Sequence, residues 1–431
     1  MPGHKGIDLY NIGDIFKYDV TEIEGMDNLL NSNGVIKETE ELYSKVYGSV
    51  KSAISTQGST LGVQMMLTMV VLAANADSKK IITDRNIHVS AINTMALLNV
   101  DPVWIYPDIH LNKFMPGIIS AQNVEQKIIE NIDAIAVYIT SPNYFGVIAN
   151  VKAIAEVCKK YNKFLLVDNA HGAHLNFIAS NLHPISCGAS ACCDSLHKTL
   201  PVLTGGGLVH VMDSRLVPYI NKARCLYSST SPSYLTMLSI DILLNYIYGN
   251  LVNDLKLLLQ KVQQLSILAQ DIGLAVPTGE LDPVKFVIGP GRFNFSSLKL
   301  AEIFRKFKIE PEYVSEYWLV FIFSTQNSNK DFDRCKSALN YIKINMSENF
   351  CCKVKNYFGD VVKLNKGLTI KEAVFGKSVK IKTEDSLGRV AAMAVTVCPP
   401  AIPIIIPGEV ISQEVIDVLL SKKINFLEVI V

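Results

Sequence analysis

Several residue types and patterns are scarce in this sequence of 431 residues, and each scarcity excludes a class of protein. Charged residues make up only 19% of the chain, against 49% hydrophobic residues, so intrinsic disorder is excluded. The formal net charge is only +1, which gives no field that would attract nucleic acid or an anionic membrane. The longest apolar stretch, residues 61–76, is too short to span a bilayer. The composition predicts a soluble globular protein with neither nucleic acid nor a membrane as its partner.

Cysteine and arginine are also used in ways that exclude common kinds of site. The nine cysteines fall at irregular positions, and no C-x-x-C motif occurs. They are expected to be reduced core residues, and the N-terminus lacks a secretory signal pattern, so the prediction is a cytoplasmic protein. Only seven residues are arginine, so sites that bind an anion through a fixed guanidinium must be few.

Helix and strand patterns alternate between Thr60 and about residue 210. This alternation is typical of a mostly parallel sheet covered by helices. A long helical segment, Tyr234 to about Asp271, then leads to short strands mixed with helices, which indicates a second, smaller α+β domain. The predicted division is an N-terminal segment at 1–34, a large domain at 35–260 and a small C-terminal domain at 261–431. Strands are expected at 81–84, 102–107, 134–140 and 163–168, with helices near 90–98, 124–130 and 151–161.

Asp168 ends a predicted buried strand, and Lys198 lies thirty residues later in DSLHKTL. In one hypothesis, Lys198 is a buried amine that forms a Schiff base with an aldehyde cofactor, while Asp168 keeps the cofactor's pyridine nitrogen protonated. In a second hypothesis, Asp168, His171 and His174 are ligands of a metal ion. A third interpretation is a loop of polar residues followed by a surface lysine.

Two further features bear on these hypotheses. Gly58, Ser59 and Thr60 stand immediately before a long predicted helix, where free N–H groups and the helix dipole favour a phosphate. An ordinary Ser or Thr N-cap is the alternative interpretation. His88 follows the strand at 81–84 and either stacks on a planar cofactor or is a hydrogen-bonded interior histidine. The segment around Gly58 contains neither a dinucleotide-binding motif nor a P-loop motif.

A phosphate-binding turn, a stacking histidine, a carboxylate and a lysine follow one another along the chain, and together they resemble a fold-type I pyridoxal-phosphate enzyme. The longer strings resemble the Orn/Lys/Arg decarboxylase family over nearly the whole chain, most weakly between about residues 250 and 375. The matching strings include PGHKG at 2–6, QGSTLG at 57–62, DRNIHVS at 84–90, TSPNYFG at 140–146, VDNAHGAH at 167–174, SLHKTLPVLTGG at 195–206, STSPSY at 229–234 and CPPAIPIIIPGE at 398–409.

The resemblance implies an α/β fold of the fold-type I transferase kind. We expect a large domain with a mostly parallel seven-stranded sheet and a smaller α+β C-terminal domain. The chain starts almost on PGHKG, so we expect a short form without the N-terminal wing domain, and whether its start is truncated stays open. Two departures from the family stand out. Asn169 replaces a glutamate, and the glycines at 205–207 replace a more polar stretch.

The resemblance also implies roles for individual residues. Lys198 would be the internal aldimine lysine, Asp168 the partner of the pyridinium nitrogen and His88 the residue stacked on the ring. Glu409 would bind the distal cation of a basic substrate. The remaining residues implied near the cofactor are Ser59, Thr60, Ser195 and His197 at its phosphate, His171 beside it, and Thr230 and Ser231 from a neighbouring subunit of a homodimer or higher homo-oligomer.

The implied activity is pyridoxal 5'-phosphate-dependent decarboxylation of lysine, arginine or ornithine to cadaverine, agmatine or putrescine, which are polyamine precursors. Lys198 or His197 would return the proton to the α-carbon. A first alternative is an aminotransferase or eliminase on the same cofactor, with Arg292 or Arg389 as the clamp for the substrate carboxylate. The others are a catalytically silent paralogue and the metallohydrolase of the second hypothesis above.

Overall fold

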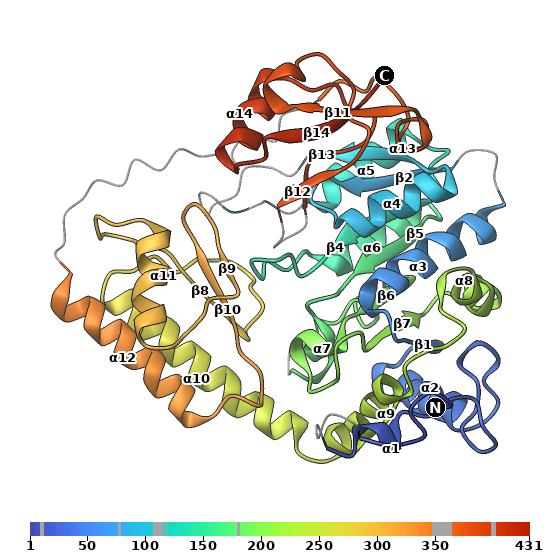
Figure 1. The fold of residues 1–431 in the computed structure, drawn as a ribbon, viewed down its shortest axis with the longest axis horizontal. Coiled ribbons are helices and arrows are strands. Elements are labelled where there is room, and N and C mark those ends of the chain that lie inside the picture. Colours follow the sequence, from blue (N-terminus) through green and yellow to red (C-terminus); the bar gives the residue numbers. More distant parts are fainter. Residues whose placement is uncertain are drawn as a thin grey trace. The chain divides into compact units, whose positions relative to one another are not determined.

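A computed structural model describes residues 1–8, 13–75, 79–106, 115, 117, 119–178, 182–346, 364–397 and 402–431 (Figure 1). The chain forms two compact units that alternate along the sequence. The first unit contains Met1–Ser78, Ile135–Ser141 and Asn150–Asp254, and the second contains Lys79–Ala134, Pro142–Ala149 and Leu255–Val431. The predicted domain boundaries after residues 34 and 260 stay a prediction.

The largest element is a seven-stranded sheet with the strand order β1-β7-β6-β5-β4-β2-β3. Strand β7 is antiparallel to its neighbours β1 and β6, whereas the pairs β2–β3, β4–β5 and β5–β6 are parallel. The predicted mostly parallel sheet is therefore confirmed. Its strands are β1 (Lys51–Ser55), β2 (Lys80–Asp84), β3 (Asp101–Ile105), β4 (Ala136–Thr140), β5 (Phe164–Asp168), β6 (Ala191–Asp194) and β7 (Gly207–Val211).

Helix α3 (Gly58–Ala74) is the central helix of the first unit. It is apolar on nearly all sides and contacts β5, β6 and β7, as expected for a helix buried in a core. Gly62 permits this packing, because a Cβ atom there would lie 2.6 Å from the Cβ of Cys193 in β6. The other α-helices described wholly within this unit are α1 (Ile15–Tyr18), α2 (Val35–Tyr47), α6 (Val151–Lys160), α7 (Leu196–Thr199), α8 (Ile220–Tyr227) and α9 (Tyr234–Tyr248).

The predicted long helical segment is two helices, because the chain leaves the helix at Gly249, the C-cap of α9. Helix α10 (Leu251–Asp271) follows. Among the described residues, no single helix is long and apolar enough to cross a membrane, although the bent pair α9 and α10 together meets the length and composition test.

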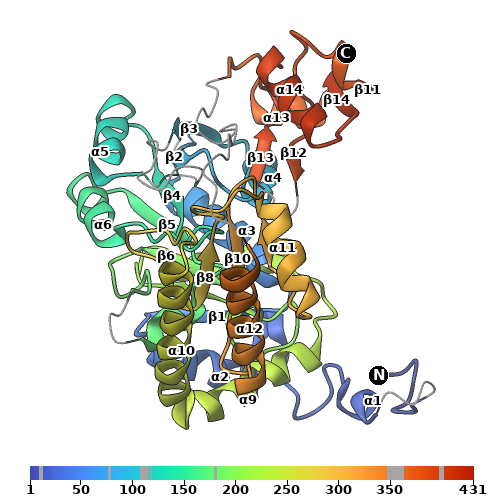
Figure 2. The same ribbon diagram turned by 90° about the vertical axis from the view of Figure 1, so that its left-hand side faces the viewer.

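The second unit contains a three-stranded sheet, β8-β10-β9 (Lys285–Ile288, Leu319–Ile322 and Tyr313–Val314). Helices α10 and α12 (Asn329–Asn345) lie side by side in Figures 1 and 2. Two strand pairs also belong to it, β11–β14 (Ser378–Lys382, Phe426–Ile430) and β12–β13 (Val395–Val397, Ile402–Ile405), as do β2 and β3 of the seven-stranded sheet. Its other helices are α4 (Val89–Leu98), α5 (Ala121–Glu130), α11 (Ser297–Lys306), α13 (Ile370–Phe375) and α14 (Gln413–Ser421).

Replacing Gly62 by alanine tests the packing of α3 against β6. Alanine is normally the better helix former, but the new Cβ would overlap Cys193, so we expect a loss of about 1–3 kcal/mol in the free energy of unfolding. Urea denaturation measures it, with Gly3→Ala as the control because a Cβ at Gly3 would contact nothing within 4 Å. A variant as stable as the wild type would contradict this close packing.

Candidate active site

Asp168 ends strand β5 and is 3% exposed. Its Oδ2 accepts a hydrogen bond from the Tyr138 hydroxyl at 3.2 Å, and its Oδ1 accepts one from the N–H of Ala170 at 3.2 Å. Tyr138 was not among the predicted site residues. The sequence alone places Tyr138 and Thr140 on one face of a strand, and the structure shows that Thr140 is the register partner of Asp168. These donors hold a buried carboxylate at the carboxyl edge of the sheet.

Lys198 lies on α7, a single helical turn that follows β6. Its Nζ is 3.2 Å from Nε2 of His171, a buried residue on the chain segment after Asp168. The hypothesis described Lys198 as a buried amine, and this is wrong for the single chain, in which Lys198 is exposed. Its side chain leaves a one-turn helix at the surface, while the histidine that it contacts is buried.

The predicted phosphate-binding residues form the first turn of α3 rather than preceding it. The N-cap is Gln57, whose side chain makes no capping hydrogen bond, so the Ser or Thr N-cap interpretation is wrong. Gly58 has φ = +63°, a conformation that favours glycine. The N–H of Ser59 donates to Oγ of buried Ser195 at 3.2 Å. A Cβ on Gly58 would lie 3.5 Å from Cε1 of His197, so the turn and the Ser195–His197 segment meet closely.

The glycines at 205–207 explain how this turn comes so near. The N–H of Gly58 donates to the Gly205 carbonyl at 2.7 Å. A Cβ on Gly205, whose φ is +93°, would lie 2.7 Å from the Thr56 carbonyl oxygen. A Cβ on Gly207 would lie 2.7 Å from the carbonyl oxygen of Asp194. Side chains at these positions would therefore separate β7 from the start of α3.

Two threonine hydroxyls show that these residues fit a polar ligand. Oγ1 of Thr140 and Oγ1 of Thr199 are buried and have no hydrogen-bond partner among the described residues. Buried polar atoms are nearly always hydrogen-bonded. Thr140 is the register partner of Asp168, and Thr199 follows Lys198. A ligand with a cationic ring nitrogen, an aldehyde and a phosphate suits this set of a carboxylate, an amine, hydroxyls and helix N–H groups.

The other residues predicted to contact the cofactor lie as follows. His88 belongs to the second unit and is the N-cap of α4, with its Nδ1 accepting from the N–H of Ser90 at 3.2 Å. Thr230 and Ser231 are exposed on the segment between α8 and α9. Stacking by His88 and a contact from Thr230 and Ser231 to a neighbouring subunit stay predictions.

The structure does not support the metal-site hypothesis for Asp168, His171 and His174. Within the described ranges, these three side chains do not form a group with ligand atoms close enough to share an ion. They are spread over a strand end, a turn and a short 3₁₀-helix, Ala173–Phe177, and this breaks the helical spacing that would align them.

The two arginines considered as carboxylate clamps both bind backbone carbonyls. Nη2 of Arg292 donates to Ile272 O at 3.2 Å, and Nη2 of Arg389 donates to Ile430 O at 2.7 Å. Each guanidinium therefore fastens two segments of the second unit.

Glu409, predicted to bind the substrate's distal cation, is 5% exposed and already paired. Its Oε2 is 2.9 Å from Nη2 of Arg85 and accepts from the N–H of Ile406 at 2.8 Å. Nη1 of Arg85 donates to Pro403 O at 3.0 Å, and the guanidinium lies over the Trp104 ring. Binding of a substrate cation by Glu409 stays a prediction, and it requires competition with Arg85. Sequence reasoning missed Arg85, although arginine is scarce in this chain.

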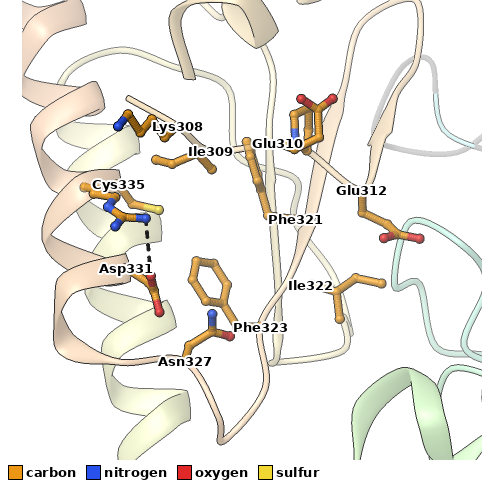
Figure 3. Close-up of a pocket in the computed structure, with 12 residues that line it drawn as sticks. Lys308, Ile309, Glu310, Glu312, Phe321, Ile322, Phe323, Asn327, Asp331 and Cys335 are labelled. Carbon is orange, nitrogen blue, oxygen red and sulfur yellow. Dashed lines mark ion pairs between the residues drawn. The ribbon is translucent and has the colours of Figure 1, made fainter. Parts of the chain in front are cut away.

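A surface pocket of about 440 Å³ lies elsewhere, between α12 and the strand β10 (Figure 3). It contains none of the predicted site residues, and three of its five charged lining residues are in ion pairs. Arg334 pairs with Asp331 at 3.7 Å, and Glu310 pairs with Arg305. We therefore assign no chemistry to this pocket.

Removing Arg85 tests the pairing of Glu409. Arg85→Met leaves a buried carboxylate without its cation, so we expect a loss of about 3–5 kcal/mol in the free energy of unfolding. Adding Glu409→Gln should recover much of that loss. The control is Lys299→Met, which breaks an exposed pair with Glu302 and should cost less than about 1 kcal/mol. Equal stability of the Arg85→Met single variant and the wild type in urea would show that Glu409 does not depend on Arg85.

Comparisons with known proteins find relatives that match almost the whole chain. The arginine decarboxylases of Halalkalibacterium halodurans and Bacillus subtilis are 28% and 27% identical over 96% of this chain, covering 87% and 88% of their own lengths. The structure of E. coli constitutive lysine decarboxylase matches with a TM-score of 0.77 and 19% identity, covering 100% of this chain and 79% of the other. The structure of lysine decarboxylase A from Pseudomonas aeruginosa matches with a TM-score of 0.80 and 16% identity, covering 98% of this chain and 73% of the other. These structural matches show a shared fold.

Two family models match the chain directly. The model described as Orn/Lys/Arg decarboxylase, C-terminal domain matches residues 361–426. The model described as Orn/Lys/Arg decarboxylase, major domain matches residues 4–272, which is more than half of the sequence. The chain therefore belongs to the Orn/Lys/Arg decarboxylase family.

Proposed function

We propose that this chain decarboxylates a basic amino acid with pyridoxal 5'-phosphate as its cofactor. The observation that carries the proposal is the juxtaposition of the Lys198 amine with His171, three residues after the buried carboxylate of Asp168. Relatives that match almost the whole chain are named arginine decarboxylases, and shorter matches are named lysine decarboxylases. These names support a basic amino acid as substrate, and arginine is the first to test.

Each site residue has a defined task in this proposal. When bound, pyridoxal phosphate supplies an electron sink for the pair of electrons that remains on the α-carbon after carbon dioxide leaves. Lys198 is the amine that carries the cofactor, and Asp168 holds a proton at the ring nitrogen through a charge-assisted hydrogen bond. His171, 3.2 Å from Nζ of Lys198, exchanges a proton with that amine. Lys198 or His197 returns a proton to the α-carbon.

The phosphate is held at the start of α3. Backbone N–H groups of the first turn point out of a helix N-terminus and favour an anion. The hydroxyls of Ser59, Thr60 and Ser195 and the imidazole of His197 supply further hydrogen bonds. The close approach of Gly58 to His197 draws these donors together.

Several features of the proposal concern groups outside this cluster. His88 stacks on the cofactor ring, and Glu409 binds the substrate's distal cation when that cation displaces Arg85. Thr230 and Ser231 complete the site of a second copy in a homodimer or larger homo-oligomer.

The cysteines described as free thiols fit a cytoplasmic location, where thiols stay reduced.

The two arginines considered as carboxylate clamps each make a backbone contact within the second unit, which agrees with the proposed decarboxylation. An aminotransferase clamps the substrate carboxylate, but the guanidinium groups of Arg292 and Arg389 donate to backbone carbonyls of their own unit. A clamp by either arginine would have to use its remaining N–H donors or replace this contact.

Replacing Lys198 tests the cofactor assignment. We expect purified wild type with added pyridoxal phosphate to show a near-visible absorbance band and to release carbon dioxide from arginine, lysine or ornithine. Lys198→Ala should lose both, because no amine then carries the cofactor. Lys222→Ala, which removes an exposed lysine on α8, is the control and should keep both.

The outcomes separate the alternatives. A band without carbon dioxide release from any of the three amino acids would indicate an aminotransferase, an eliminase or a silent paralogue. The absence of a band in the wild type would overturn the cofactor assignment itself.

Replacing Asp168 tests the ring-nitrogen role. Asp168→Asn keeps the shape of the side chain but removes its negative charge. We therefore expect the cofactor to bind, while the rate of carbon dioxide release falls by about a hundredfold or more. Tyr138→Phe removes only one donor to the same carboxylate and should have a smaller effect. Single-turnover decarboxylation measures both, and wild-type rates in Asp168→Asn would contradict the role.

A further inference from the structure

Asp194 is a fully buried carboxylate in the first unit that the proposed chemistry does not use. Side chains alternate between the two faces of a strand, so Cys193 and Asp194 of β6 point in opposite directions. Sγ of Cys193 donates to Oδ1 of Asp168 at 3.7 Å. Asp194 instead binds Asn169, the next residue after Asp168, whose Nδ2 donates to Oδ1 at 2.7 Å. The two strand ends are therefore linked on both faces of the sheet.

Two histidines complete the surroundings of Asp194. Nε2 of His183 and Nε2 of His210 lie 3.0 Å and 3.4 Å from its Oδ2, and all three side chains are 0% exposed. On the other side of its ring, His210 binds Oγ of Ser52 in β1 through Nδ1 at 2.8 Å. The Tyr47 ring stacks on the same imidazole with centroids 4.1 Å apart. One carboxylate thus connects β5, β6 and β7, and reaches β1 through His210.

A metal ion is the first alternative for this group, since the three ligand atoms lie within 4.8 Å of one another. The hydrogen bonding of His183 argues against it. The N–H of Ile185 can only donate, and it points to Nδ1 of His183 at 3.4 Å. Nδ1 therefore presents its lone pair, and the ring proton belongs on Nε2, which donates to Asp194. A nitrogen that carries a proton cannot bind a metal.

The protonation of the group agrees with a hydrogen-bond network. Burial alone would raise the pKa of Asp194, but its interactions with His183 and His210 hold that pKa well below the usual range. Burial lowers the pKa of His210. The network therefore contains an ionised carboxylate that accepts hydrogen bonds from Asn169 and His183 and lies close to the His210 imidazole.

We propose that Asp194 is a positioning residue that sets the spacing between Asp168 and the turn carrying Lys198. The backbone ladder between β5 and β6 ends at the pair Asp168–Cys193, and the N–H of Asn169 then donates to Cys193 O at 3.0 Å. The Asn169–Asp194 bond extends this pairing by one residue. Asp194 directly precedes Ser195 and lies four residues before Lys198. The inference rests on the proposed function, because the spacing matters for a cofactor held from both strands.

The sharpest test replaces Asn169 by aspartate in the full chain loaded with pyridoxal phosphate. A second carboxylate would then stand beside Asp194, and two buried carboxylates at this distance must share a proton. At low pH the protonated pair can keep the bond that Asn169 makes. As the pH rises the pair loses that proton, and repulsion separates the strand ends. We therefore expect kcat and the absorbance band of Lys198-bound cofactor to gain a titration, absent from the wild type, with loss on the alkaline side.

Asp194→Asn provides a second variant. It removes the charge that accepts from Asn169 and His183 and that His210 faces, and it presents an amide N–H₂ to Asn169. We expect kcat to fall by about a hundredfold, because small misplacements of catalytic groups have effects of this size, while KM changes little. If this variant does not fold, Asn169→Asp at low pH still decides the question.

Asn176→Asp is the matched control, because Nδ2 of Asn176 donates to the carbonyl of Val46 and not to a carboxylate. It should keep the wild-type pH profile. The apo chain gives a reading independent of activity, since the Tm of Asn169→Asp should fall more steeply with rising pH than the Tm of Asn176→Asp.

The outcomes distinguish the two proposals. A wild type with an absorbance band and carbon dioxide release, together with an Asn169→Asp variant that has the wild-type pH profile, overturns only the positioning role. A variant whose Tm changes with pH while its kcat profile does not shows a purely structural network and also overturns it. A wild type without an absorbance band overturns the proposed function and the inference with it.

Discussion

The pairing of β5 with β6 is the constraint on which the predicted chemistry depends. The two strands run parallel from Leu166–Ala191 to Asp168–Cys193, so both end at the same edge of the sheet. The chain then leaves β5 through Asn169 to His171 and leaves β6 through Ser195 to Lys198. The 3.2 Å contact between His171 and Lys198 follows from this common edge, since parallel strands bring residues far apart in sequence to one line.

Much of this arrangement could be predicted from the sequence, because strong local patterns decide it. The apolar runs of β4 and β5 locate the strands, and a carboxylate at the end of a buried run predicts where Asp168 lies. Local patterns failed where backbone conformation or a remote partner decides the outcome. Helix α3 begins at Gly58, before the Ser–Thr pair, and the positive φ of this glycine is not visible in any residue pattern. The exposure of Lys198 depends on a one-turn helix that no periodicity reveals. The partner of Glu409 is Arg85, which lies 324 residues earlier in the sequence, and no local pattern links positions so far apart.

Glu409 and Asp194 are both buried carboxylates that have lost contact with water. Different kinds of partner compensate the charge of each one. Glu409 is balanced by the guanidinium of Arg85 and an N–H group, so removing the cation leaves an uncompensated charge. Asp194 is balanced by an amide and two imidazoles, a set whose charge depends on protonation. The first arrangement fastens the chain near β13 to the end of β2 within the second unit. The second links the ends of β5 and β6 through an amide and places two imidazoles against the same carboxylate.

Side-chain alternation gives these links a further consequence. Asp168 and Cys193 lie on one face of the β5–β6 pair, while Asn169 and Asp194 lie on the other. A slip of one residue in the register would exchange these faces and bury Asp168 among the histidines. The Asn169–Asp194 bond can form only in the native register, because Asp194 must face His183 and His210 at the same time. The polar network behind the sheet is therefore compatible only with the native register of β5 and β6.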